Sequence, residues 1–139
     1  MTYSEKLIRG IASKDFIDPE GRASAALFQF GKDIREDGFA EASITWYDDE
    51  TSLDCVMNQR KPDGSIQFKI GVAIISRSWI DMLIRQPTGK DNLKYERAPL
   101  TENPAHGNLL RNDSAINGQI KSVISASIAM GVERVITQT

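Results

Sequence analysis

Strict alternation of side chains in residues 39–47, FAEASITWY, is the feature that most limits how this chain can fold. One face would carry Ala40, Ala42, Ile44 and Trp46, and the other would carry Phe39, Glu41, Ser43, Thr45 and Tyr47. A two-residue period is typical of a β-strand with one buried face. A single strand cannot bury that face alone, so the segment predicts a sheet covered on one side.

Three other segments have strand character. Residues 7–12 (LIRGIA) form a short apolar run. Residues 93–100 alternate up to Pro99, which favours an edge strand because proline cannot donate to a ladder. Residues 65–76 become continuously apolar towards their end, which is typical of a central strand buried on both faces. We therefore expect a sheet of about four strands.

Helical spacing marks the segments between these strands. Residues 23–30 favour helix by their alanines, and residues 77–86 repeat apolar side chains at helical spacing. Residues 48–60 are predicted to be a loop followed by a helix, in which Thr51 and Asp54 form a near capping box.

The C-terminal segment predicts the longest helix of the chain. From Ser114 onward, apolar residues repeat every three or four positions, which places them on one helix face. They are Ile116, Ile120, Val123, Ile124, Ile128, Val132 and Val135. We expect about five turns, with Asp113 or Ser114 as N-cap and with Gly118 and Gly131 inside the helix.

Together these elements predict an α+β fold in which residues 1–139 form a single domain. The expected architecture is a mixed or mainly antiparallel sheet covered by helices, with the long C-terminal helix as the main cover. Helices and strands do not alternate regularly enough for a doubly wound sheet.

Composition excludes several classes of protein. A net charge of -2 argues against a general nucleic-acid binder. No window approaches a membrane span, and the N-terminus lacks the apolar core of a signal peptide. Because the chain has one cysteine, Cys55, and one histidine, a structural zinc site is close to excluded. We expect a cytoplasmic protein with no metal and no cofactor.

His106 is the first candidate site residue. It lies in the segment PAHGN (104–108), predicted to be a loop ahead of the last helix, and loops on a rigid frame often carry binding residues. Asn103 and Asn108 could orient the ring or hold a ligand. The alternative is a turn histidine whose ring is satisfied by a backbone carbonyl.

Arg9 is the second candidate, because an arginine inside an apolar strand needs an explanation. Its fixed fork of N–H donors suits a carboxylate or a phosphate, and Gly10 would let a ligand approach the backbone. The alternative is that Arg9 points to solvent while its apolar neighbours pack.

Two further groups are interpreted as structural. The acidic residues Asp48, Asp49, Glu50 and Asp54 match no metal motif and would favour the start of the next helix. Cys55 has no activating base nearby in sequence, although His106 could supply one in space, so a buried inert thiol is expected.

Two resemblances add context. The spaced patterns D-x-x-G-x-x-S-x-x-L-F (18–28), A-x-I-x-W (42–46) and PAHGN are similar in style to short bacterial proteins that are often encoded beside a partner gene. The early arginine and the later polar loop also resemble small ADP-ribosyltransferase-like toxins. That resemblance implies that Arg9 holds NAD and that Glu96 or Glu102 is the acid, but the S-T-S and E-x-E motifs of such toxins are missing.

Two functions follow as hypotheses. The first is a non-enzymatic bacterial accessory module, of antitoxin or defence type. It would bind a small ligand, or a protein partner or second copy through the C-terminal helix. The second is a small transferase or hydrolase that acts on a nucleotide-like substrate, with Arg9 on the phosphate and with His106 and Asn108 orienting the substrate. Convergence of Arg9, His106 and a carboxylate in one cleft would favour the enzyme, whereas a large apolar patch on the helix would favour the binding module.

Overall fold

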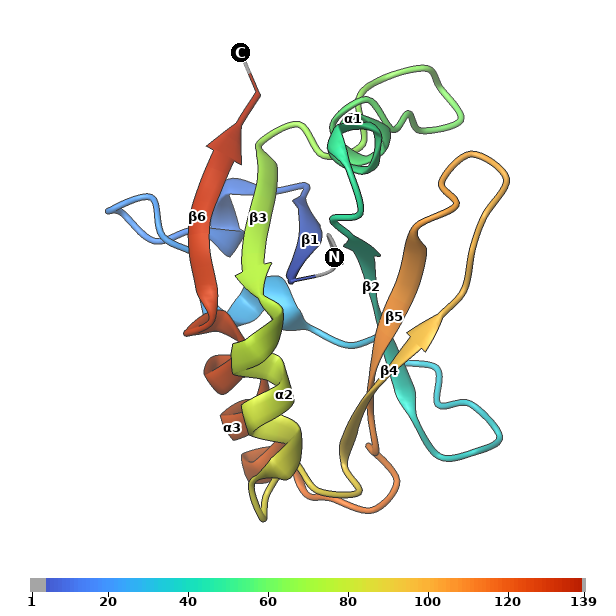
Figure 1. Cartoon of the computed structure of the whole chain (residues 1–139). Coiled ribbons are helices and arrows are strands. Elements are labelled where there is room, and N and C mark those ends of the chain that lie inside the picture. The colour runs from blue at the N-terminus through green and yellow to red at the C-terminus, as the bar shows by residue number, and fades with distance from the viewer. Residues whose placement is uncertain (1–4, 139) are drawn as a thin grey trace.

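Six antiparallel strands form one open sheet in a computed structural model of the chain, which describes residues 5–138 (Figure 1). In chain order the strands are β1 (Lys6–Ile11), β2 (Ala40–Trp46), β3 (Gly71–Ser76), β4 (Leu93–Arg97), β5 (His106–Arg111) and β6 (Val132–Thr137), and their order across the sheet is β4-β5-β2-β1-β3-β6. The helices are α1 (Glu50–Met57), α2 (Arg77–Arg85) and α3 (Gly118–Ala129), with two short 3-10 turns, η1 (Lys14–Phe16) and η2 (Ala25–Phe28). The predicted α+β class is confirmed, with six strands rather than about four.

The main core lies between the sheet and the layer formed by α2, α3 and η2. Ile80 of α2, Ile128 of α3 and Phe28 of η2 are fully buried there against the inward side chains of the strands. The helix α1 lies on the opposite face, where Val56 packs over Ile8 and two side chains of β3. Helices therefore cover both faces of the β1–β3 half of the sheet.

The alternation predicted for residues 39–47 is confirmed in β2. Its four apolar side chains are at most 4% exposed and face the main core. Glu41, Ser43 and Thr45 face the other side of the sheet, where β5 pairs with β2 so that Ser43 lies opposite Asn108 and Thr45 opposite His106. This second face carries the polar residues considered below.

The predicted strand 65–76 is wrong in its first half. The strand β3 begins only at Gly71, where the carbonyl of Ile136 approaches so closely that a Cβ would lie 1.9 Å from its oxygen. Residues 65–70 instead follow the surface, with one isolated bridge between Arg60 and Ile66. From Gly71 to Ile75 the strand is buried as expected, although it lies one position from the sheet edge.

The predicted five-turn C-terminal helix is also wrong. The helix α3 begins after Asn117, whose side chain accepts a hydrogen bond from the Ile120 N–H at 2.9 Å, so neither Asp113 nor Ser114 is the N-cap. It ends before Gly131, which packs against the ring of Trp79 so closely that a Cβ would lie 2.3 Å away. The chain then turns back as β6, pairing Val135 with Ala73 of β3.

The segment around His106 is a strand and not the predicted loop. The strand β5 has a partner on each side, β2 and β4, and its residues 107–111 are buried. The strand β4 is an edge strand as predicted. Hence β5 and β6 are the two strands that the sequence patterns did not predict.

Two smaller expectations change as well. Residues 23–30 form only the 3-10 turn η2 rather than an α-helix. The N-cap of α1 is Asp49, whose carboxylate accepts from the Ser52 N–H at 3.1 Å, so Thr51 and Asp54 do not form the predicted capping box.

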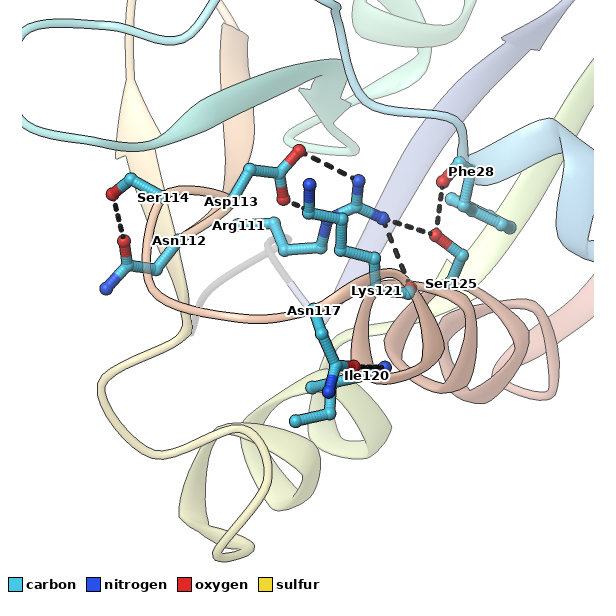
Figure 2. A network of polar contacts seen from close by, with 9 residues as sticks. All are labelled: Phe28, Arg111, Asn112, Asp113, Ser114, Asn117, Ile120, Lys121 and Ser125. Atoms are coloured by element: carbon cyan, nitrogen blue, oxygen red, sulfur yellow. Dashed lines mark hydrogen bonds and ion pairs between the residues drawn. The ribbon is translucent and has the colours of Figure 1, made fainter.

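A buried ion pair fastens α3 to the end of β5 (Figure 2). Arg111 and Asp113 are both less than one-tenth exposed, and the guanidinium donates to the carboxylate through Nε and through a terminal nitrogen at 2.9 Å. The other terminal nitrogen donates to Ser125 Oγ at 2.9 Å, and that hydroxyl donates to the carbonyl of Phe28 at 2.7 Å. One network therefore joins the strand, the helix and η2.

Candidate functional site

A split between β1 and β2 creates the candidate site. The strand β1 pairs with β3 over its whole length, from Lys6 to Ile11. Between β1 and β2 the paired residues are Leu7 with Trp46 and Ile8 with Thr45. Beyond Ile8 the two strands separate, so carbonyl groups of β2 on that edge need another donor.

Arg9 supplies that donor. One terminal nitrogen donates to the carbonyl of Ser43 on β2 at 2.7 Å. The Nε atom donates to the carbonyl of Leu27 at 3.1 Å, and the second terminal nitrogen reaches the carbonyl of Gln29 at 3.4 Å. These bonds use one N–H of each nitrogen, so both terminal nitrogens keep a second N–H.

The charge of Arg9 has no carboxylate partner among the described residues. Burial lowers the pKa of Arg9 to about 10, so the side chain is still protonated at neutral pH. A desolvated cation that is held only by carbonyl dipoles favours a nearby anion. Arg9 therefore does not point freely to solvent, which was one of the two alternatives.

A cleft of about 280 Å³ opens beside the split. Arg9, Gly10 and Ser43 line it, together with residues of the chain that follows α1. Leu100 and His106 also line the cleft, and they belong to the β4–β5 loop and the start of β5. In Figure 1 both α1 and the β4–β5 loop lie at the upper end of the sheet.

His106 lines this cleft together with Arg9. Its Nδ1 lies 2.9 Å from the carbonyl oxygen of Ala98. Because a carbonyl can only accept, Nδ1 carries a proton and Nε2 of the neutral ring is an acceptor. No side chain or backbone group of residues 5–138 hydrogen-bonds to Nε2. The ring is thus both fixed by a backbone carbonyl and able to meet a ligand.

Asn103 is a buried residue that contacts one of the lining residues of the cleft, Thr45. It is 3% exposed and donates from Nδ2 to the hydroxyl oxygen of Thr45 at 2.9 Å. Thr45 lines the cleft, and since its oxygen accepts from Asn103, its own proton remains to be donated. Within the described part of the chain, the Oδ1 atom of Asn103 is buried without a hydrogen-bond partner. Asn103 therefore positions Thr45 and does not itself line the cleft.

Asn108 is occupied outside the cleft. It donates to Glu41 at 2.7 Å and to Glu96 at 3.3 Å, so it joins two carboxylates on the polar face of the sheet. Arg35 also holds Glu96, at 2.9 and 3.0 Å. The hydrogen bond from Arg35 is the main cause that keeps the pKa of Glu96 below its usual range.

The arrangement implied by the ADP-ribosyltransferase resemblance is not assembled. Glu96 is bound to Arg35 and Asn108, and Glu102 is exposed in the β4–β5 loop. Among the described residues that line the cleft with Arg9 and His106 there is no carboxylate. The cleft therefore holds cationic and neutral polar groups but lacks the acid that the resemblance requires.

The acidic group after β2 has structural partners. Asp48 pairs with Arg97, Asp49 caps α1, and Glu50 accepts from the hydroxyl of Tyr47 at 3.2 Å. Cys55 is partly buried on α1 and does not line the cleft with His106. Over residues 5–138 we find no group of three or more His, Cys, Asp or Glu side chains that could hold a metal ion.

The surface segment between α1 and β3 supplies lining residues that were not predicted from the sequence. Gln59, Gln67 and Phe68 come from the surface segment between α1 and β3. The backbone N–H of Gln67 donates to the Gln59 carbonyl at 2.9 Å, which brings the two glutamines together. The turn KPDG (61–64) between them was the one sequence signal that could have suggested this pairing.

Comparisons of this chain with family models, with curated proteins and with solved structures found no match. Within residues 5–138, none of the helices is both long enough and apolar enough to cross a membrane.

Proposed function

We propose that this protein is a small-ligand-binding module and that its ligand is a small anion held in the cleft between Arg9 and His106. The observation that carries the proposal is the partly buried side chain of Arg9, which lines the cleft and has only backbone carbonyls as partners in the described chain. A bound anion would offset the cost of burying this charge.

The other polar groups of the cleft suit the same ligand. The hydroxyl of Thr45 can donate a hydrogen bond. Nε2 of His106 accepts a hydrogen bond when the ring is neutral and donates one when the ring is charged. A phosphate group can use Arg9, Thr45 and His106 together, because its ionised oxygens accept hydrogen bonds and the P–OH group of its monoprotonated form donates one. A carboxylate, which only accepts, can use all three when the His106 ring is charged. A cation would be repelled by Arg9 and would find no carboxylate among the described lining residues.

Binding is favoured over catalysis because the described cleft offers a single titratable acid–base group, His106, beside Arg9. General acid–base hydrolysis commonly uses a second group to protonate the leaving atom. A transferase or hydrolase that acts on a nucleotide-like substrate therefore remains the second hypothesis for this cleft. It also requires that Arg9 binds an anion.

Thermal unfolding tests the proposal. We would add inorganic phosphate, with chloride at equal ionic strength as the salt control, to the wild-type protein and to Arg9→Gln and His106→Ala. Phosphate at about 100 times its Kd should stabilise the wild type by about 2.7 kcal/mol. Both substitutions should remove most of this gain, because each deletes a contact with the anion.

Arg85→Gln is the matched control, since Arg85 is an exposed arginine on α2 that does not line the cleft. It should keep the full response to phosphate. If Arg9→Gln does not fold, His106→Ala decides the matter alone. An equal response in the wild type and in His106→Ala, or no response of the wild type to phosphate or to any anion of a carboxylate and phosphate-ester panel, would contradict the proposal.

A second candidate function uses the outer surface of α3. An apolar groove of about 350 Å³ runs between α2 and α3, and Val123 and Met130 beside it are 49% and 73% exposed. Exposed apolar side chains that gather in one groove favour contact with another protein or with a second copy of the chain. Sedimentation of the wild type and of Val123→Glu tests self-association, and a capture experiment with the wild type tests for another protein. A mass above the monomer that Val123→Glu reduces supports self-association. A monomeric wild type that captures no partner contradicts this function.

A further inference from the structure

Two of the residues that line the cleft, Gln59 and Gln67, form an amide pair. Gln59 donates from Nε2 to Oε1 of Gln67 at 2.9 Å, and both side chains are partly buried. This bond leaves an acceptor oxygen on Gln59 and N–H donors on Gln67. An inorganic anion held by Arg9 would not need this pair of neutral groups.

Phe68 adds an aromatic surface next to the pair. Its ring lies against the backbone of Gly10, where a Cβ would come within 2.3 Å of the ring. The close approach that Gly10 allows is therefore taken by Phe68, and not by a ligand as the sequence suggested. The ring is held on β1 and lines the cleft together with Arg9.

The cleft thus combines three kinds of partner in about 280 Å³. There is a cation for a phosphate group, a partly buried aromatic ring among the lining residues for contact with a flat ring, and an amide pair with donor and acceptor atoms for a polar edge. A fatty acid would not use the amides, and a neutral sugar would not use the cation. The volume lies just below the usual range for small-molecule sites, about 300–1,000 Å³, so a ligand with two nucleotide units is too large.

We infer that the cleft takes a nucleoside monophosphate, with its phosphate at Arg9, its base on Phe68 and the polar edge of that base on the Gln59–Gln67 pair. This inference rests on the proposed function, because it needs Arg9 to hold the phosphate.

Isothermal titration calorimetry distinguishes the nucleotide inference from the proposed anion-binding function. We would compare AMP, GMP, CMP and UMP with ribose 5-phosphate, which has the phosphate and no base. At least one nucleotide should bind about tenfold more tightly than ribose 5-phosphate, the size expected for an amide that reads a base edge.

Gln67→Met should reduce that preference to about twofold or less and leave the affinity for ribose 5-phosphate unchanged. Gln119→Met, an exposed glutamine on α3, is the matched control and should keep the preference. If all four nucleotides bind no better than ribose 5-phosphate, the nucleotide inference is wrong while the anion site stands. If neither ribose 5-phosphate nor any nucleotide binds, the nucleotide inference is wrong, and the proposed function is wrong as well when no anion of the phosphate, carboxylate and phosphate-ester panel binds.

Discussion

At the residue scale, two arginines that are removed from solvent have different roles in this protein. Arg111 is buried together with a carboxylate, Asp113, and acts as a structural link. Arg9 is partly buried among carbonyl groups, and burial lowers its pKa to about 10. The absence of a carboxylate beside Arg9 in the described chain, next to a cleft, is what makes it the stronger candidate for a ligand contact.

Arg111→Ala should destabilise the protein strongly. The substitution leaves Asp113 buried without its partner and removes the donor to Ser125, and breaking such a buried pair costs about 3–5 kcal/mol. Urea unfolding measures the loss. Arg85→Ala, at an exposed position of α2, should change stability by less than about 0.5 kcal/mol. Equal stability of the two variants would show that the network in Figure 2 does not fasten α3.

The carboxylate of Glu96 should make stability depend on pH. Arg35 keeps the pKa of Glu96 below its usual range, so the folded state favours the ionised form. This contribution is present above the ordinary pKa of glutamate, about 4.3, and is lost as pH falls through the lowered pKa of the folded state. Urea midpoints should therefore separate wild type from Glu96→Gln at neutral pH and converge in acid. A gap that is constant with pH would contradict this, and Glu102→Gln, at an exposed glutamate, should show no such gap at neutral pH.

At the scale of elements, the start of α3 distinguishes the structure from the sequence expectation. Asn117→Ala should cost about 1 kcal/mol, because the Ile120 N–H loses its side-chain acceptor. Ser114→Ala should cost much less, since Ser114 is exposed and lies outside the helix. Thermal or urea unfolding of the two variants measures this. A larger loss for Ser114→Ala would favour the longer helix that the apolar spacing predicted.

The elements that could be predicted are those whose apolar pattern has one interpretation. Residues 39–47 alternate without exception, and β2 follows them. Val132 and Val135, in contrast, continue the spacing of the helix, and only the contact of Gly131 with Trp79 and the pairing with β3 make them a strand. The strand β5 contains Gly107 and Asn108, which are poor strand residues, and it forms because two partner strands enclose it.

The candidate site could be predicted only in part, because single residues can be found in the sequence but the geometry that joins them cannot. His106 stands out as the only histidine of the sequence, and Arg9 stands out as an arginine inside an apolar run. The split between β1 and β2, and the two glutamines that face it, depend on strand register and on a surface segment that no local pattern specifies. Asn108 was grouped with His106 by its closeness in sequence, but its hydrogen bonds go to Glu41 and Glu96.

At the scale of the whole molecule, the sheet supports the cleft at the point where β1 and β2 separate. The helices α2 and α3 close one face, α1 closes half of the other, and the β4–β5 loop lies across from α1 (Figure 1). The cleft lies where these covers leave β1 and β2 apart. A cleft formed where two strands separate is held in place by the strands on either side, which suits the binding function proposed above.

The central claim is that an anion binds beside His106, and the single histidine of the chain allows a direct measurement. A long-range ¹H–¹⁵N spectrum of the neutral imidazole ring should show the proton on Nδ1, where the Ala98 carbonyl accepts it. Titration with phosphate or AMP should then shift the Nε2 resonance in wild type and in Arg85→Gln, and the shift should be lost in Arg9→Gln. An Nε2 resonance that stays in place while the ligand saturates the protein would contradict the account.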